Sequence, residues 1–175
     1  MIRLVSLIRG ALIAISVGAL IYSLLIISGA WKPVFEIRLS EEIDAPPAKV
    51  WQVITDTHLY HEWNPFIVGC ETTFEVGSPI HMQVQFKPGS QRAQTETVRA
   101  NREGEYLEYG ISAPMGALQS TREHVLIPLP AGGTRYESNF VLSGWLGPIV
   151  SFFLGKQLQQ GFEGMTKGIA NRSVA

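Results

Sequence analysis

Few residues of this 175-residue chain have the types and spacing that metal chemistry requires. His58 and His61 are three positions apart, so a helical turn would place both imidazoles on one side. A metal site also needs a further ligand such as a carboxylate, and the adjacent Glu62 would point elsewhere on a helix. We therefore expect exposed polar residues here and no metal site.

A second group lies in a predicted strand, where Ser120, Arg122 and His124 alternate with other residues and so share one face. If that face lines a cavity, Arg122 and His124 could orient a polar ligand group or polarise a carbonyl. If it faces water, the same residues are solvated side chains of a sheet. Tyr109 could also hydrogen-bond a ligand, although aromatic strand residues are more often part of the core.

Glu41 interrupts an apolar strand face, since strict alternation groups it with Ile37, Leu39 and Ile43. A carboxylate on such a face is a possible general acid or base. A β-bulge at Ser40 and Glu41, or the end of the strand, would instead turn it outward. We expect the second arrangement.

The rest of the sequence offers no catalytic constellation. Cys70 is the single cysteine, and neither a G-x-S-x-G motif nor a glycine-rich phosphate loop occurs. The formal net charge is -1 without a basic stripe, which argues against nucleic acid as a partner. We expect no catalytic residue, no metal and no cofactor.

The elements that would carry these residues begin with an apolar segment. Residues 10–31 form an uncharged run of 22 residues, preceded by Arg3 and Arg9 and followed by Lys32. A helix of this length spans about 30 Å, the thickness of a bilayer core. With Trp31 at the far interface, the pattern predicts a single-pass anchor over residues 1–32, with a cytoplasmic N-terminus and an extracytoplasmic domain.

Two alternatives remain for this segment. Ser28, Gly29 and Ala30 could form a signal cleavage site, which would give a secreted domain, although the apolar run exceeds the usual signal length of about 7–15 residues. The segment could also be the core helix of a soluble protein.

Residues 33–175 read as one domain. Alternation predicts a first strand from Phe35, and Pro46 and Pro47 can open a short helix. A second helical turn covers residues 58–63, and we expect Asp56 to cap it. Six more strands are predicted over residues 67–74, 80–86, 91–101, 106–111, 118–127 and 134–142.

The last segment changes period. Leu154, Leu158, Phe162, Met165 and Ile169 recur at three- and four-residue spacing, which predicts a helix of about 20 residues from Pro148. It is the large element that can cover the apolar face of the sheet.

The pattern I-D-A-P-P from Ile43, followed by Val50-Trp51, Asp56 and Trp63-Asn64-Pro65, resembles the START-like superfamily. Within that superfamily the likeness is to polyketide cyclase/dehydrase-type (SRPBCC) members, and it covers residues 35–170. The resemblance implies an α+β helix-grip fold, in which a curved antiparallel sheet of about seven strands wraps a long C-terminal helix. Two short helices follow the first strand, and a deep apolar cavity lies inside.

Members of that superfamily bind lipids, sterols, polyketides or plant hormones, and only some are catalysts. The resemblance implies a binding or carrier module for a lipid-like, aromatic or polyketide-like ligand, and the apolar segment outside the shared pattern would anchor this module to a membrane. The alternative is a cyclase- or dehydratase-like enzyme, which convergence of ionisable groups in the cavity would favour; a filled cavity would indicate a scaffold. Expected cavity residues are Trp51, Trp63, Tyr109, Arg122, His124, Leu158 and Phe162, with Glu41 as a possible acid or base.

Overall fold

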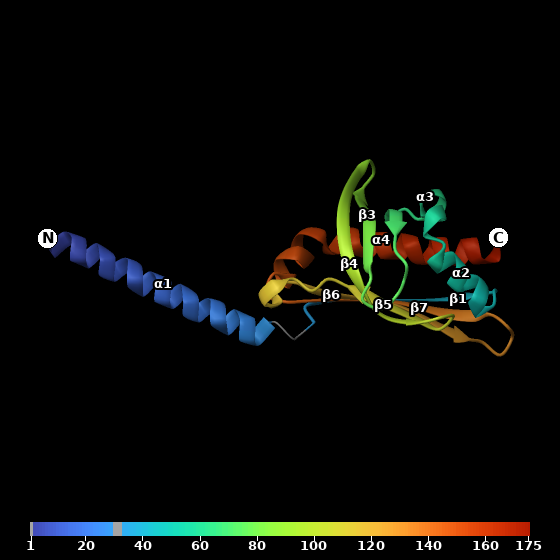
Figure 1. Cartoon of the computed structure of the whole chain (residues 1–175), viewed down its shortest axis with the longest axis horizontal. Helices are drawn as coiled ribbons and strands as arrows, with labels where there is room; N and C mark the ends of the chain where they lie inside the picture. The colour runs from blue at the N-terminus through green and yellow to red at the C-terminus, as the bar shows by residue number, and fades with distance from the viewer. Residues whose placement is uncertain (1, 30–32) are drawn as a thin grey trace.

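The computed structural model describes residues 2–29 and 33–175 (Figure 1). The helices are α1 (Ile2–Gly29), α2 (Pro47–Thr55), η1 (Thr57–Leu59), α3 (Tyr60–Trp63), η2 (Pro114–Gly116) and α4 (Gly147–Val174). The strands are β1 (Phe35–Ile43), β2 (Ile67–Glu71), β3 (Pro79–Lys87), β4 (Ser90–Arg102), β5 (Tyr106–Gly110), β6 (Gln119–Pro128) and β7 (Thr134–Ser143).

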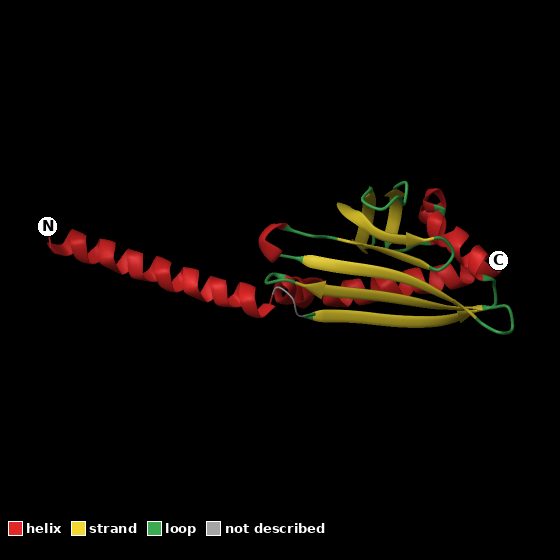
Figure 2. Ribbon diagram, turned by 60° about the horizontal axis from the view of Figure 1, so that its bottom comes forward, coloured by secondary structure: helices red, strands yellow, loops and turns green. Residues whose placement is uncertain are grey.

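The strands form one antiparallel sheet in the order β1-β7-β6-β5-β4-β3-β2. The long helix α4 runs along one face of this sheet (Figure 2). The α+β architecture, with seven strands, the short helices α2, η1 and α3 after β1, and a long C-terminal helix, confirms the expected helix-grip fold.

Curvature is concentrated in one half of the sheet. The pairings β2–β3, β3–β4 and β4–β5 each contain a register shift, whereas β1 and β6 pair with β7 without one. Bulges of this kind bend a strand and increase its twist. In Figure 1, β3 and β4 rise steeply away from the flatter half of the sheet, which makes the sheet concave toward α4.

The turn before β2 packs directly on α4. Asn64 Oδ1 accepts hydrogen bonds from the backbone N–H groups of Phe66 and Ile67, each at 3.0 Å, and so shapes this turn. A Cβ atom at Gly161 would lie 2.3 Å from the Phe66 ring, and one at Gly164 would lie 2.8 Å from the Pro65 ring. The glycines of α4 therefore allow this close approach.

Three local expectations are corrected by the backbone. Strand β1 pairs with β7 without interruption, so there is no bulge at Glu41, which is half-buried on the inward face. Asp56 precedes η1, but its carboxylate makes no capping hydrogen bond. Strand β2 ends at Glu71, because the Thr72 hydroxyl then accepts from Phe74 N and turns the chain away from the sheet.

The expected membrane anchor is also corrected. Within residues 2–29 and 33–175, no helix has both the length and the apolar character needed to cross a membrane. The prediction of a single-pass anchor, on which the extracytoplasmic placement of the domain depended, is therefore wrong. The proposed interfacial residues Trp31 and Lys32, and the alternative cleavage site at Ala30, lie outside the described residues.

Helix α1 is likewise no core helix, because side chains along it, such as Leu12, Ile15 and Leu20, are exposed. Figure 1 shows α1 extending away from the sheet and α4.

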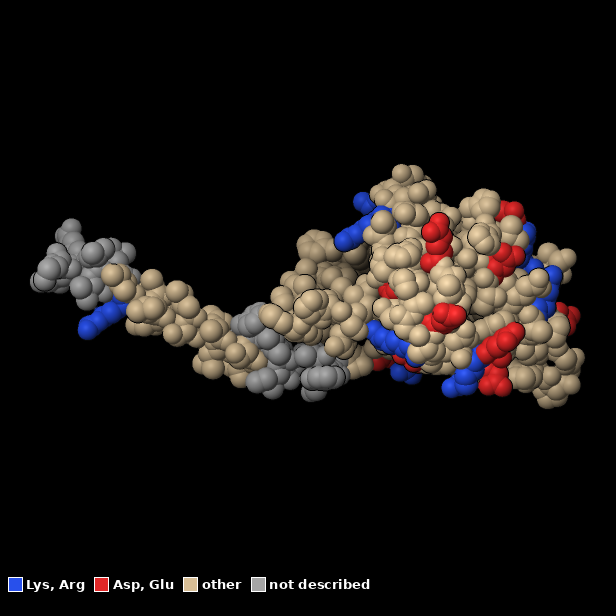
Figure 3. All heavy atoms as spheres, in the orientation of Figure 1, with Lys and Arg blue, Asp and Glu red and all other residues tan. Residues whose placement is uncertain are grey.

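On the face shown in Figure 3, acidic and basic side chains are interspersed over the domain.

Candidate functional site

A cavity of about 200 Å³ lies between the concave face of the sheet and the N-terminal half of α4. Most of its wall is apolar. The apolar lining residues are Phe66, Ile67, Met82, Val84, Phe86, Ile111, Leu118, Phe140, Leu142, Val150, Leu154, Leu158 and Phe162.

Polar groups enter this cavity from the middle of the sheet. The inward face of β4 contributes Arg92, Gln94 and Glu96, β5 contributes Tyr109, and β6 contributes Ser120 and Arg122. On β6 the buried positions alternate through Ser120, Arg122, His124 and Leu126. Of the two orientations left open by the sequence, the inward one is therefore correct.

Arg122 is the most deeply buried cation of the site, with 1% of the residue exposed. Its Nη1 donates to the backbone carbonyl of Asn139 at 3.3 Å, and its Cζ lies 4.4 Å from the centre of the Phe162 ring. Its Nε and Nη2 have no hydrogen-bond partner among the described residues. A fixed positive charge thus forms part of a mainly apolar wall.

His124 lies behind this wall, between two tyrosines. Its Nδ1 is 2.7 Å from the Tyr136 hydroxyl and its Nε2 is 3.2 Å from the Tyr109 hydroxyl, and its ring stacks on both phenol rings. Burial, and then the charge of Arg122, lower the pKa of His124 well below its usual value. The imidazole is therefore neutral near pH 7, and one ring nitrogen donates while the other accepts. Its contacts fix the position of Tyr109, which lines the cavity.

Glu96 is the acidic group of the cavity, with 6% of the residue exposed. Its Oε1 accepts a hydrogen bond from Gln94 Nε2, and its Oε2 has no hydrogen-bond partner in the described part of the chain. Burial raises the pKa of Glu96 to about 7, against the opposing effects of the Gln94 hydrogen bond and then of Arg122 and Arg99. A carboxyl group that titrates near neutral pH can hold or release a proton at physiological pH.

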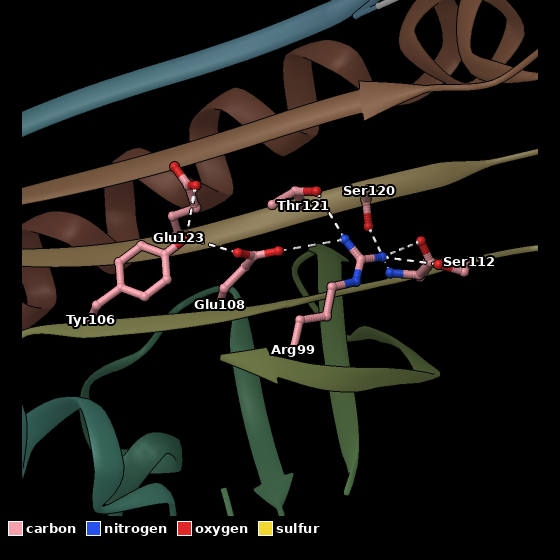
Figure 4. A network of polar contacts seen from close by, with 8 residues as sticks. Arg99, Tyr106, Glu108, Ser112, Ser120, Thr121 and Glu123 are labelled. Carbon is pink, nitrogen blue, oxygen red and sulfur yellow. Dashed lines mark hydrogen bonds and ion pairs between the residues drawn. The ribbon is translucent and has the colours of Figure 1, made fainter. Parts of the chain in front are cut away.

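A polar network on the opposite face of the sheet supports the cavity from behind (Figure 4). Arg99 Nη1 donates to Thr121 Oγ1 at 2.9 Å, and its Nη2 donates to the carbonyl of Ile111 at 2.8 Å and to Ser112 Oγ at 3.1 Å. Because Ile111 lines the cavity, these bonds from β4 fix the segment that leaves β5 for η2.

The same network continues along β5 and β6. Arg99 forms a long ion pair with Glu108 at 3.9 Å, and the Tyr106 hydroxyl lies within hydrogen-bond distance of the Glu108 and Glu123 carboxylates (Figure 4). Burial, followed by these hydrogen bonds, raises the pKa of Tyr106, so the phenol remains a donor. The network therefore holds β4, β5 and β6 in register behind the cavity.

The structure brings four of the expected ligand residues together in the cavity wall: Tyr109, Arg122, Leu158 and Phe162. His124 contacts Tyr109 from behind. Trp51 is buried in the core through α2, and the Trp63 ring packs edge-to-face on Tyr60 at 5.1 Å. Neither tryptophan lines the cavity, and neither does Glu41.

Glu96 was missed because the sequence around it is polar on both strand faces. Gln91, Thr95 and Thr97 mark one face, and Arg92 and Gln94 precede Glu96 on the other. One residue indicated the inward face of this strand: Val98 lies two positions after Glu96, so alternation places both on the same face, and Val98 is apolar and buried.

A curved antiparallel sheet that encloses an apolar cavity against a long C-terminal helix defines the helix-grip class of proteins. Residues 34–172 match the family model described as polyketide cyclase / dehydrase and lipid transport. The chain belongs to this family, which confirms the START-like resemblance. No curated protein matches the sequence.

Solved structures show the same fold at low sequence identity. A START superfamily protein from Mycobacterium smegmatis aligns with a TM-score of 0.61 and 18% identity, over 79% of this chain and 97% of that one. The protein TTHA0849 from Thermus thermophilus aligns with a TM-score of 0.60 and 18% identity, over 79% of this chain and 97% of that one. The di-domain ARO/CYC StfQ of the steffimycin biosynthetic pathway aligns with a TM-score of 0.63 and 13% identity, over 81% of this chain and 51% of that one.

Proposed function

We propose that this protein binds a small, mainly apolar molecule in the cavity between the sheet and the N-terminal half of α4. The observation that carries the proposal is a cavity of about 200 Å³ with apolar walls and a few convergent polar groups. Ligand sites in proteins have this composition. The family description, which includes lipid transport, supports the same function.

The size of the cavity limits the ligand. An apolar cavity of about 150 Å³ is enough to hold benzene, whereas pockets for drug-sized ligands measure about 300–1,000 Å³. A cavity of about 200 Å³ therefore suits one substituted ring or an acyl chain of medium length. A larger aromatic or polyketide-like ligand would require the walls to move apart.

A thermal shift measured together with native mass spectrometry tests this function. The full chain is incubated with n-butylbenzene, a neutral apolar molecule with one ring and a short side chain. We expect one bound molecule per chain and a melting temperature that rises with probe concentration, because a ligand that binds only the folded state stabilises it. Probe that merely adheres to the exposed side chains of α1 would leave the melting of the domain unchanged. Absence of both effects would contradict the proposal.

Glu96 supports a second candidate, a cyclase- or dehydratase-like enzyme. A carboxyl group with a pKa of about 7 can remove a proton from the carbon next to a ligand carbonyl. Arg122, which lines the same cavity, would stabilise the oxygen on which negative charge develops. Cys70 lies outside the lining residues, and burial raises the pKa of its thiol to about 12, so it is no nucleophile at neutral pH.

Exchange of ligand protons in deuterium oxide tests the catalytic candidate. We expect wild-type protein to accelerate deuterium exchange next to the carbonyl of a bound ketone such as 2-octanone, and Glu96→Gln to abolish the acceleration. Mass spectrometry of the recovered ketone measures the exchange. A rate equal to that in buffer, with the ketone shown to be bound, would leave binding without catalysis.

A further inference from the structure

One edge of the Arg122 guanidinium makes no hydrogen bond within the described protein. Nη1 is occupied by the Asn139 carbonyl, whereas Nε and Nη2 have no partner among residues 2–29 and 33–175. The N–H bonds of Nε and Nη2 point side by side along the same edge of the planar group. This fork matches the two oxygens of a carboxylate, whereas a single carbonyl or hydroxyl oxygen uses it less fully.

Burial makes this unoccupied edge informative. The side chain is nearly inaccessible to solvent, and arginine stays charged in proteins. A buried charge without a counter-ion is unfavourable. Phe162 provides a cation–π contact at 4.4 Å, which attracts the charge but accepts no conventional hydrogen bond. Burial raises the pKa of Tyr136, and Arg122 opposes this rise through its charge and through a weak hydrogen-bonding interaction with the hydroxyl. That hydroxyl does not meet the distance and angle of a hydrogen bond to Nε or Nη2, so both groups stay without a full partner among the described residues.

Glu96 does not supply the missing anion. Both residues line the cavity, but none of the ion pairs of the described residues joins them. Burial holds the pKa of Glu96 at about 7, so a large fraction of the molecules carries a neutral carboxyl group at neutral pH. A neutral Glu96 can donate its proton to an anion that is bound beside Arg122.

The remaining walls describe the rest of the ligand. Met82, Val84 and Phe86 of β3 face the cavity, as do Val150 and Leu154 of α4. These side chains offer no hydrogen bonds, so they favour a hydrocarbon body. Charge is concentrated in the middle of the sheet, and the apolar surface extends from it.

We propose that the ligand is a small monocarboxylic acid, whose carboxylate pairs with Nε and Nη2 of Arg122 and whose apolar body lies between β3 and α4. This inference rests on the proposed binding function and adds the chemical class of the ligand. The acid has the length of a medium acyl chain or of a single ring with a short side chain, because the cavity measures about 200 Å³.

A matched pair of probes tests the charge. Calorimetry on the full chain at pH 7 compares octanoate with octanamide, which has the same chain and nearly the same shape but no charge. We expect octanoate to bind at least about tenfold more tightly, because hydrogen bonds to a charged partner are roughly twice as strong as neutral ones.

Two variants locate the carboxylate. Arg122→Gln should weaken octanoate binding at least about tenfold and change octanamide binding by less than about threefold, since only the first probe uses the charge. Arg135→Gln is the control, because Arg135 is an exposed arginine of β7 that does not line the cavity. It should leave both affinities unchanged. Arg122→Lys should give an intermediate octanoate affinity, because lysine retains the charge without the fork.

Each outcome bears on a different claim. Equal affinity of the wild-type protein for octanoate and octanamide would overturn the carboxylate assignment and leave the binding function intact. A folded Arg122→Gln variant that keeps the octanoate preference of the wild-type protein and of Arg135→Gln would overturn the role of Arg122. If neither octanoate, octanamide nor n-butylbenzene binds, the proposed function itself fails. If Arg122→Gln does not fold by circular dichroism, the two wild-type affinities and Arg122→Lys still decide the question.

Discussion

The two halves of α4 belong to one amphipathic helix but face different interiors. In the C-terminal half, Met165 and Ile169 are fully buried, and this end lies beside α2 and α3 (Figure 1). In the N-terminal half, Val150 and Leu154 line the cavity and are only half-buried. The same stripe of apolar side chains thus completes a packed core at one end and walls a cavity at the other.

The difference arises from the elements opposite each half. Val50 and Ile54 of α2 are fully buried and fill the space next to the C-terminal half. No such helix covers the N-terminal half within the described residues; there the curved strands β3 and β4 face α4 across the cavity. Packing therefore provides stability at one end of the helix, and a binding site remains at the other.

Removal of the whole helix should have the largest effect. Deleting residues 148–175 would expose the inward face of the sheet to water, including Ile37, Tyr136 and Phe140. Each buried apolar side chain of this size contributes about 1.5–3 kcal/mol by transfer, and a domain has a total stability of about 5–15 kcal/mol. We expect no cooperative thermal transition by circular dichroism. A soluble fragment that melts cooperatively would show that α4 does not grip the sheet.

Single truncations should separate the two halves. Ile169→Ala opens a gap in a packed region and should lower the free energy of unfolding by about 2–5 kcal/mol. Leu154→Ala enlarges an existing cavity, so we expect a loss below about 1.5 kcal/mol together with altered probe affinity. Urea titration followed by fluorescence gives both values. Equal losses would contradict the division of the helix.

Phe162 lies at the boundary between the halves. It lines the cavity, but its ring also packs at 5.0 Å from the Phe66 ring and 4.8 Å from the Phe140 ring. We therefore expect Phe162→Ala to resemble the packed half, with a loss of about 3–5 kcal/mol.

The pH dependence of stability should come partly from the cavity. The pKa of Glu96 is raised to about 7, so its contribution is fully present below about pH 4.5 and is lost as pH rises through 7. His124, whose pKa is lowered, has the opposite sign: its contribution is present above about pH 6.5 and is lost on acidification.

Comparison with Glu96→Gln isolates the first effect, because His124 is present in both proteins. The stability of wild type relative to the variant should fall by up to about 3 kcal/mol between pH 4.5 and pH 8. Urea titrations at several pH values measure it. A difference that stays constant with pH would show that Glu96 titrates normally.

Glycine substitutions should give the smallest difference in stability between the two halves of α4. Gly161→Ala places a methyl group against the buried Phe66 ring, where an ideal Cβ would lie 2.3 Å away, and should destabilise by about 1–3 kcal/mol. Gly155→Ala, in the other half, meets the half-buried Phe35 ring at 3.2 Å. The gain in helix propensity of up to about 1 kcal/mol should largely offset that contact. Thermal melts of the two variants test the order.

Sequence periodicity and turn residues located the strands and α4, and the family resemblance supplied their helix-grip arrangement. Periodicity also identified α4 as the cover of the sheet. It could not show where the stripe from Leu154 to Ile169 is packed, since that depends on α2 and on the curvature of β3 and β4. These elements come together only through long-range pairing.

The candidate site was predicted in part. Ser120, Arg122 and His124 were correctly grouped on one face of β6, but their polar character left the direction of that face undecided. Leu126 follows in the same alternation and is apolar and buried, which indicates that this face points inward. Trp51 and Trp63 were predicted to line the cavity because they are aromatic and lie within the family motif. Their rings instead complete the packing of α2 and α3.

A cavity-filling substitution tests the central claim most directly. Leu154→Trp places an indole in the cavity, whereas Lys156→Trp adds the same group at an exposed position of the same helix. The measurement is the affinity of both variants for n-butylbenzene by calorimetry, with folding verified by circular dichroism. If the cavity is the binding site, Leu154→Trp loses saturable binding and Lys156→Trp retains the wild-type affinity. Retained binding in a folded Leu154→Trp variant would contradict the account.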